Sequence, residues 1–163
     1  MSSAPRPAII PAPYRVLFTT LEPLLATSGA VQAFFFPSSL LGATMPSVPY
    51  TPSLAPLFTQ MTGAWLMLAF HDAVALRSAP YADDVRAWRH TLAASAISDL
   101  FYAAALVQGT GAARLLNPLR WDLMNAVTVV TTLGPFLAKL CFLAGLGLPK
   151  IPAAKTGDAR KTK

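Results

Sequence analysis

The chain has 163 residues, of which 54% are hydrophobic and only 12% charged, and its formal net charge is +6 at pH 7. Charged residues make up about a quarter of an ordinary soluble domain, so this composition excludes a soluble globule and predicts a protein that is surrounded by lipid. The basic residues flank apolar runs and form no stripe with interleaved aromatic residues, which argues against nucleic acid as a partner. The single cysteine and the spacing of His, Asp and Glu match no metal or nucleotide motif, so we expect neither a metal nor a cofactor.

The beginning of the chain is predicted to be a flexible, proline-containing tail over residues 1–13, followed by a transmembrane domain over residues 14–147. The first span covers about residues 16–36 and contains Glu22 and Pro23. A proline inside a helix leaves a carbonyl without its donor, here beside a carboxylate. A secretory signal is the competing interpretation, but the apolar run is longer than the ~7–15 residues of such a signal, so we expect the span to be retained.

The second and third spans follow a proline-rich stretch, residues 37–56, that we expect to be a loop. The second span covers about residues 57–76 and carries His71 and Asp72, and the third covers about residues 87–107. Asp83 and Asp84 precede the third span and are suited to cap its helix.

Asp99 lies near the middle of the third span. A charge at bilayer depth costs roughly 2.5–3.5 kcal/mol on insertion scales, so an acid there is taken to be functional by default. A purely structural hydrogen bond is the alternative. Asp99 and Tyr102 share one helical face with two hydroxyl residues, which are Thr91 and Ser95.

The fourth span covers about residues 123–143 and begins just after Trp121 and Asp122. One of its faces carries Asp122, Asn125, Thr128 and Thr132. If this polar face is opposite that of the third span, the two line a cavity between helices. Residues 148–163 are predicted to be a disordered basic tail.

Four apolar segments, each close to the ~20 residues that cross a bilayer, predict an all-α fold, an integral membrane four-helix bundle with both termini on one side. That side would hold most of the basic residues, and the other side would hold Arg114 and Arg120. The positive-inside rule then places both termini in the cytosol. The residues on the basic side are Arg6, Arg15, Arg77, Arg86, Arg89, Lys150, Lys155, Arg160, Lys161 and Lys163.

These features resemble a fungal family of small four-helix integral membrane proteins of uncharacterised function, over about residues 11–147. The resemblance rests on PYRVLFTTLEPLLATSGA, FHDAVALR, SDLFY and RWDLMNAV. Asp72 stands where that family usually has Glu, and Tyr102 stands where a His commonly follows the acid of the third span. Members of such families often occur among secondary-metabolite genes, so the resemblance implies a role in biosynthesis. A looser similarity of size and layout links the chain to emopamil-binding sterol isomerases and small membrane terpene cyclases, by analogy only.

The enzyme hypothesis is an acid-catalysed isomerisation or cyclisation of a terpenoid, steroid or polyketide intermediate. Burial disfavours the charged form of a carboxylic acid, so Asp99 is the expected general acid, and Glu22 or Asp72 takes the proton back. The substrate-binding residues are predicted to be His71, Tyr102, Trp121 and Asn125.

The alternative hypothesis is a non-catalytic scaffold or lipid-binding subunit that holds partner enzymes at one membrane. The expected partners are therefore the lipid bilayer, a lipophilic small molecule and other membrane enzymes. We expect the endoplasmic reticulum as the location, because lipophilic intermediates are handled there, and residues 160–163 approximate a retrieval signal. An ordinary solvated basic tail explains the same residues.

Overall fold

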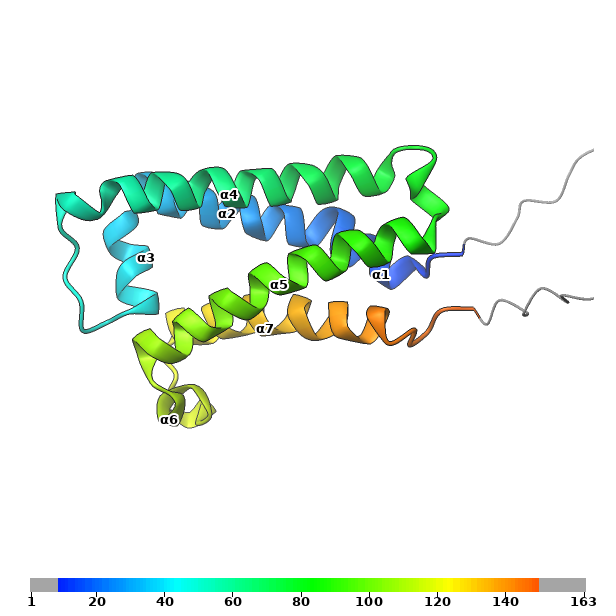
Figure 1. Cartoon of the computed structure of the whole chain (residues 1–163). Coiled ribbons are helices and arrows are strands. Elements are labelled where there is room, and N and C mark those ends of the chain that lie inside the picture. Colours follow the sequence, from blue (N-terminus) through cyan, green and yellow to red (C-terminus); the bar gives the residue numbers. More distant parts are fainter. Residues whose placement is uncertain (1–8, 150–163) are drawn as a thin grey trace, which may run out of the picture.

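A computed structural model describes residues 9–149 and contains only helices, turns and connecting segments over that range, so the predicted all-α class is confirmed (Figure 1). Most of the two predicted tails, residues 1–8 and 150–163, lies outside the described residues.

The first rod is built from three consecutive segments, α1 (Ala12–Val16), the π-helical η1 (Leu17–Leu21) and α2 (Glu22–Phe35). Pro23 has no N–H to donate and its ring crowds the preceding turn, and the helix widens to π-helical geometry immediately before it. Pro37 restricts the backbone of the residue before it, and the chain bends there by 114° into a further helix, α3 (Pro37–Thr44). The expectation of a loop throughout residues 37–56 was therefore wrong at both ends, because residues 37–44 form α3 and helical structure resumes at Pro52.

The rest of the chain forms three long helices joined by short helical turns. Two of these helices begin at an aspartate whose carboxylate accepts backbone N–H groups, Asp84 and Asp122. The predicted cap at Asp84 is thus confirmed, whereas Asp83 forms an ion pair with Arg15. The elements are η2 (Pro52–Leu54), α4 (Ala55–Val74), η3 (Ala75–Arg77), η4 (Tyr81–Asp83), α5 (Val85–Thr110), α6 (Ala112–Leu115), η5 (Pro118–Arg120) and α7 (Leu123–Leu143).

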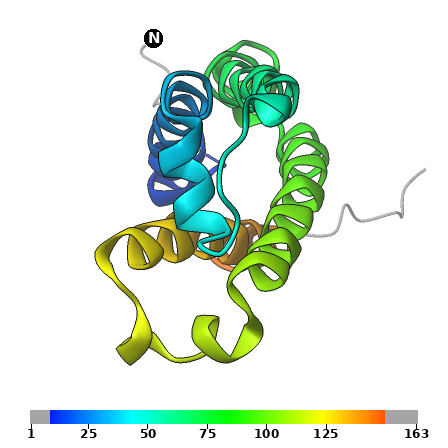
Figure 2. The same cartoon turned by 90° about the vertical axis from the view of Figure 1, so that its left-hand side faces the viewer.

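The long helices form two antiparallel pairs, with α2 packed along α4 and α5 packed along α7 (Figure 1); Figure 2 shows the two pairs from the end of the bundle. α3 lies across one end of the bundle, where it contacts α5 and α7. The first and last described residues lie together at the other end (Figure 1), and the hydroxyl of Tyr14 donates to the carbonyl of Leu146 at 2.9 Å there. The two pairs are thus held together at both ends of the molecule.

Two buried apolar clusters close the two ends of the bundle and leave its middle to polar residues. The cluster at the end with the chain termini consists of Ile10, Phe18, Leu76, Trp88, Leu92 and Phe142. The cluster near α3 consists of Ala33, Leu40, Leu41 and Phe58.

Two or three of these helices are apolar enough to cross a membrane. α5 and α7 are long and apolar enough by themselves, and the bent rod formed by Ala12–Phe35 and Pro37–Thr44 qualifies if it counts as one span. α4 is not among them, because Gln60, His71 and Asp72 lower its hydropathy. The chain therefore has the character of a membrane protein, and a crossing by all four long helices stays a prediction.

Candidate functional site

The centre of the bundle contains a lysine, Lys139 of α7, whose side chain has 0% exposure. Its Nζ donates to Oδ2 of Asp99 in α5 at 2.6 Å and also to Oε1 of Glu22 in α2. Lysine is almost never fully buried unless it is paired, and here one ammonium group has two carboxylate partners. This side chain therefore connects both helix pairs, since α2 belongs to one pair and α5 and α7 to the other.

Lys139 is the residue of this cluster that the sequence analysis missed, although the sequence carries a signal for it. Its position is seven residues after Thr132, so it continues the polar face that carries Asp122, Asn125, Thr128 and Thr132. A lysine on the polar face of an apolar helix faces the bundle interior, where an acid can pair with it. Asp99 and Glu22 are the acids that do so.

A cavity of about 190 Å³ lies beside this cluster, between the two helix pairs. All four long helices and α3 contribute to its wall. The polar residues of the wall are Glu22, Ser28, Gln32, Asp72, Ser98, Asp99, Tyr102, Thr128, Thr131 and Thr132. The apolar ones include Leu25, Leu40, Trp65, Leu68, Met124 and Val127.

Asp72 is the most deeply buried acid of the cavity wall, since only 3% of its side chain is exposed. Its Oδ1 has no hydrogen-bond partner within residues 9–149, and Nδ1 of His71 lies 3.6 Å from it. Oε2 of Glu22 is likewise buried and without a partner in the part of the chain that the structure describes. Two buried carboxylate oxygens, on residues that line the cavity, thus lack a donor within the described residues, and a buried acceptor without a donor is costly.

The charges of the cavity do not balance, because Glu22, Asp72 and Asp99 face one ammonium group, that of Lys139. Full ionisation would leave an excess of negative charge in a low-dielectric interior, which is strongly disfavoured. The cluster is therefore suited to retain a proton that it can exchange with a bound molecule. Within the described residues, no group of three or more His, Cys, Asp or Glu side chains is placed to hold a metal ion.

The model of one protein family, a domain of unknown function designated DUF7704, matches residues 7–149. This chain belongs to the DUF7704 family. No match was found among curated proteins or among solved structures. The matched residues include every residue of the cavity wall and Lys139, so the site lies inside the domain that defines the family.

The structure of this DUF7704 protein brings four of the predicted site residues together. Asp99, Glu22, Asp72 and Tyr102 all line the cavity. The ring of Tyr102 lies edge to face against Trp65, with 5.6 Å between the ring centroids. Thr128 and Thr132 of the predicted polar face of the fourth span also line it, as that pattern indicated.

The other three predicted site residues lie off the cavity wall. The amide of Asn125 is buried and donates to the carbonyl of Ala43 at 3.2 Å, so it connects α7 to α3. The indole of Trp121 donates to the carbonyl of Arg114 at 3.1 Å, in the connection between α5 and α7. The side chain of His71 is about half exposed and borders Asp72 from outside. These contacts are structural for Asn125 and Trp121, whereas His71 is a neighbour of a cavity acid.

Proposed function

We propose that this DUF7704 protein is a four-span integral membrane protein that transfers protons to and from a lipophilic small molecule held in the central cavity. The reaction we favour is an isomerisation or cyclisation of a terpenoid, steroid or polyketide intermediate. The observation that carries the proposal is the cluster of Lys139 with the Glu22 and Asp99 carboxylates, buried beside a cavity in a bundle with an apolar exterior.

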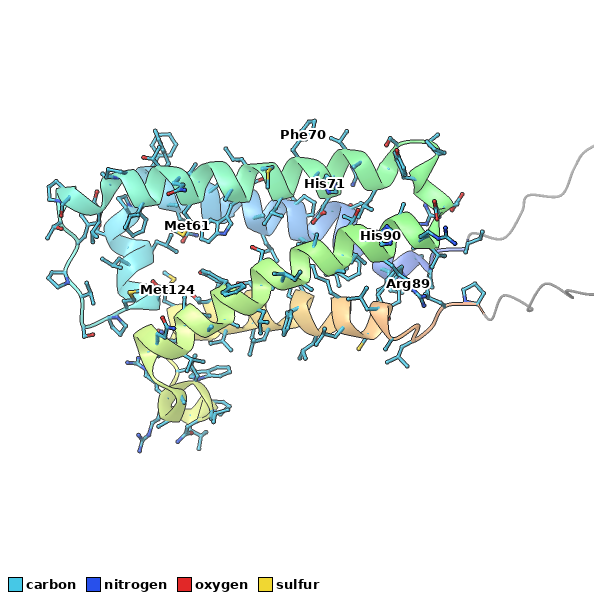
Figure 3. The ribbon with its side chains drawn as sticks, viewed as in Figure 1. Met61, Phe70, His71, Arg89, His90 and Met124 are labelled. Atoms are coloured by element: carbon cyan, nitrogen blue, oxygen red, sulfur yellow. The ribbon has the colours of Figure 1, made fainter. Side chains whose placement is uncertain are left out.

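The distribution of polarity supports a crossing by all four long helices. Large apolar side chains are exposed on each of them, for example Phe35 of α2, Phe70 of α4, Phe101 of α5 and Val130 of α7. Phe70 points away from the bundle (Figure 3). Monomeric soluble proteins rarely expose apolar surface on this scale, and here the charged cluster lies inside. α4 has 20 residues, which at ~1.5 Å per residue is enough for a bilayer core of ~30 Å.

Both termini are proposed to be cytosolic. The end of the bundle with the chain termini carries Arg15, Arg77, Arg86 and Arg89, and Arg89 lies there in Figure 3. The opposite end carries Arg114 and Arg120. An excess of basic residues marks the cytoplasmic side of membrane proteins.

Asp99 is the proposed general acid because, among the three acids, it combines contact with Lys139 and the greatest side-chain exposure, 22% against 13% for Glu22 and 3% for Asp72. Its carboxyl group gives a proton to an alkene or epoxide of the substrate. Lys139 donates to the Asp99 oxygen and stabilises the carboxylate that forms. The bound cation then loses a proton to Glu22 or Asp72, so the number of protons is unchanged over an isomerisation.

Aromatic rings on the cavity wall support this chemistry. Trp65 and Tyr102 line the cavity, and aromatic faces attract cations. They would replace Trp121, which the sequence analysis predicted to bind the substrate and which lies off the cavity wall. The resemblance to a fungal family found among secondary-metabolite genes favours a secondary metabolite as substrate and the endoplasmic reticulum as the location.

The test is metabolite profiling of a deletion strain complemented with the parent protein, with Asp99→Asn or with Asp83→Asn. Asp83 is a matched control because it is an acid at the end of the bundle, paired with Arg15 and remote from the cavity. The abundance of each variant in membranes is measured in parallel. We expect Asp99→Asn to accumulate one precursor at normal abundance, and Asp83→Asn to behave as the parent does.

A different pattern of results would favour the scaffold hypothesis. In that case Asp99→Asn would lower the abundance of the protein or of partner enzymes, and no single precursor would accumulate. Normal product formation by an abundant Asp99→Asn variant would refute the role of Asp99 as general acid.

A further inference from the structure

We infer that the connection between α5 and α7 inserts three leucines into the surface of a lipid bilayer. The connection consists of residues 111–122, which include α6 and η5, and Leu123 follows it as the first residue of α7. The inference requires that α5 and α7 cross a membrane. It does not depend on any reaction in the cavity, so it goes beyond the proposed function.

The three leucines are Leu116, Leu119 and Leu123. Within residues 9–149 they are the most exposed of the large apolar side chains, at 83%, 96% and 82%. Single exposed leucines are common on proteins in water, but here all three lie in residues 116–123. Apolar surface that gathers in one exposed place marks a site of contact with a membrane or with another protein.

The backbone of the connection forms its hydrogen bonds within the connection itself. From Arg114 to Trp121, every residue except Pro118 donates its backbone N–H to an oxygen atom of residues 111–118. Pro118 has no N–H to donate. A connection in water does not need such bonds, because water accepts from a free N–H group, whereas an N–H group next to hydrocarbon is costly without an acceptor. The connection is therefore suited to lie against acyl chains.

The place of the connection in the fold is the surface of a membrane. α5 and α7 are each long and apolar enough to cross a bilayer, so the segment between them lies where they leave it. The connection extends sideways from the bundle (Figure 2), and α3 and the start of α4 lie farther out along the bundle than α6 does (Figure 1). With the long helices across the membrane, α6 thus stays level with the boundary of the bilayer and does not project into water.

The charged and aromatic residues of the connection fit the boundary between headgroups and acyl chains. Arg114 and Asp122 neutralise each other in an ion pair of 3.0 Å. Arg120 has no carboxylate partner among the residues that the structure describes, and its long side chain can reach a lipid phosphate while Leu119 enters the acyl chains. Trp121 is of a residue type that is enriched at membrane interfaces.

Lipid is favoured over a second protein as the occupant of this surface. A protein partner would have to match the three leucines in shape, whereas the bilayer meets them as soon as α5 and α7 cross it. Segments that lie in the interface typically bury their apolar side chains about 5–10 Å into the boundary between headgroups and acyl chains. Leu119 is the residue best placed to report this depth, because its side chain is almost completely exposed.

The experiment measures the depth of a nitroxide label in full-length protein in phospholipid nanodiscs. Cys141, the single cysteine of the chain, is first replaced by Cys141→Ala. The label is then attached in turn to Leu119→Cys, to Ser53→Cys and to Phe101→Cys. Ser53 is the control in water, since it is exposed in η2 at the same end of the bundle. Phe101 is the control in lipid, since it is exposed on α5.

The readout is the relaxation of the label by oxygen, which concentrates in lipid, divided by its relaxation by a polar nickel chelate in water. We expect this ratio at Leu119 to be at least about fivefold higher than at Ser53 and closer to that at Phe101, because hydrocarbon excludes a polar chelate. Helical circular dichroism of each labelled variant should match that of the parent.

Three outcomes would overturn the inference, and each has a different meaning. A ratio at Leu119 equal to that at Ser53, with a high ratio at Phe101, would place the connection in water and leave the membrane crossing intact. Low ratios at both Leu119 and Phe101 would also refute the crossing by α5, and with it the membrane part of the proposed function. A Leu119 label that neither reagent reaches would show a contact with protein, such as a second copy of the chain.

A second readout uses the parent protein without any substitution. The nanodiscs then contain a phospholipid that carries a diazirine near the ester end of its acyl chain, and labelled residues are located by mass spectrometry. We expect residues 116–123 to be labelled severalfold more than residues 45–51, which connect α3 to η2 at the same end of the bundle. Labelling of residues 116–123 at or below the level of residues 45–51 would overturn the inference.

Discussion

Replacing Lys139 with methionine removes the ammonium group and keeps an unbranched apolar side chain of similar length. The change leaves the carboxyl groups of Glu22 and Asp99 without their ammonium partner at the centre of the bundle. Removal of one partner from a buried ion pair costs about 3–5 kcal/mol, because the remaining charge is buried and uncompensated. Lys139 is completely buried and serves two acids, so we expect a loss of unfolding free energy within that range.

The assay is unfolding by sodium dodecyl sulfate in mixed lipid and detergent micelles, followed by tryptophan fluorescence and by helical circular dichroism. The matched comparison is the triple variant Lys139→Met, Glu22→Gln, Asp99→Asn. Replacement of a whole buried ion cluster by neutral groups is often neutral or stabilising by about 1–4 kcal/mol. We therefore expect the triple variant to recover most of the stability that Lys139→Met loses. A Lys139→Met variant as stable as the parent, or a triple variant less stable than Lys139→Met, would refute the charge argument.

Three further predictions concern contacts that hold the cavity wall in place. Gly109→Ala would put a Cβ 2.3 Å from the carbonyl oxygen of Thr44, so it should destabilise the protein by a few kcal/mol in the same unfolding assay, whereas Gly63→Ala meets nothing within 4 Å and should be neutral or slightly stabilising. Asp84→Ala removes the cap of α5 and should cost about 1 kcal/mol, and Asp84→Asn should retain most of that stability. Asn125→Ala removes the amide donor to α3 and should speed proteolysis of residues 45–51 without a comparable effect on the helical signal.

The helical class, the position of Asp99 and the cap at Asp84 could be predicted because each depends on local sequence. A long run of apolar residues predicts a helix, and a charged residue in the middle of that run is easily recognised. An aspartate just before a helix is recognisable as its cap, because its side chain accepts the first backbone N–H groups. The polar faces of the third and fourth spans follow from helical spacing in the same way. Tyr102, Thr128 and Thr132 duly line the cavity.

The partners of the acids could not be predicted from local sequence, because they depend on the rotation of each helix about its own axis. The pairing of Glu22 with Lys139 joins residues that are 117 positions apart. The π-helical segment Leu17–Leu21 changes the rotation of everything before Glu22, and the 3.6-residue period does not reveal it. α3 was missed for a different reason, since Pro37 occupies the first turn of a helix, where proline is tolerated.

The cluster has a further consequence for how the cavity can open. Lys139 connects α7 and α5 to α2, so the separation of the two helix pairs is limited by the contacts of one ammonium group. In the proposed reaction Asp99 gives up its proton, and its attraction to Lys139 would then grow, because an ammonium group interacts more strongly with an anion than with a neutral acid. Proton transfer to a bound molecule would then draw the pairs together around it, and return of the proton would release them. Proton transfer and closure of the cavity would thus be linked through Lys139. We expect the triple variant Lys139→Met, Glu22→Gln, Asp99→Asn to be stable but to lose both the proton transfer and the closure.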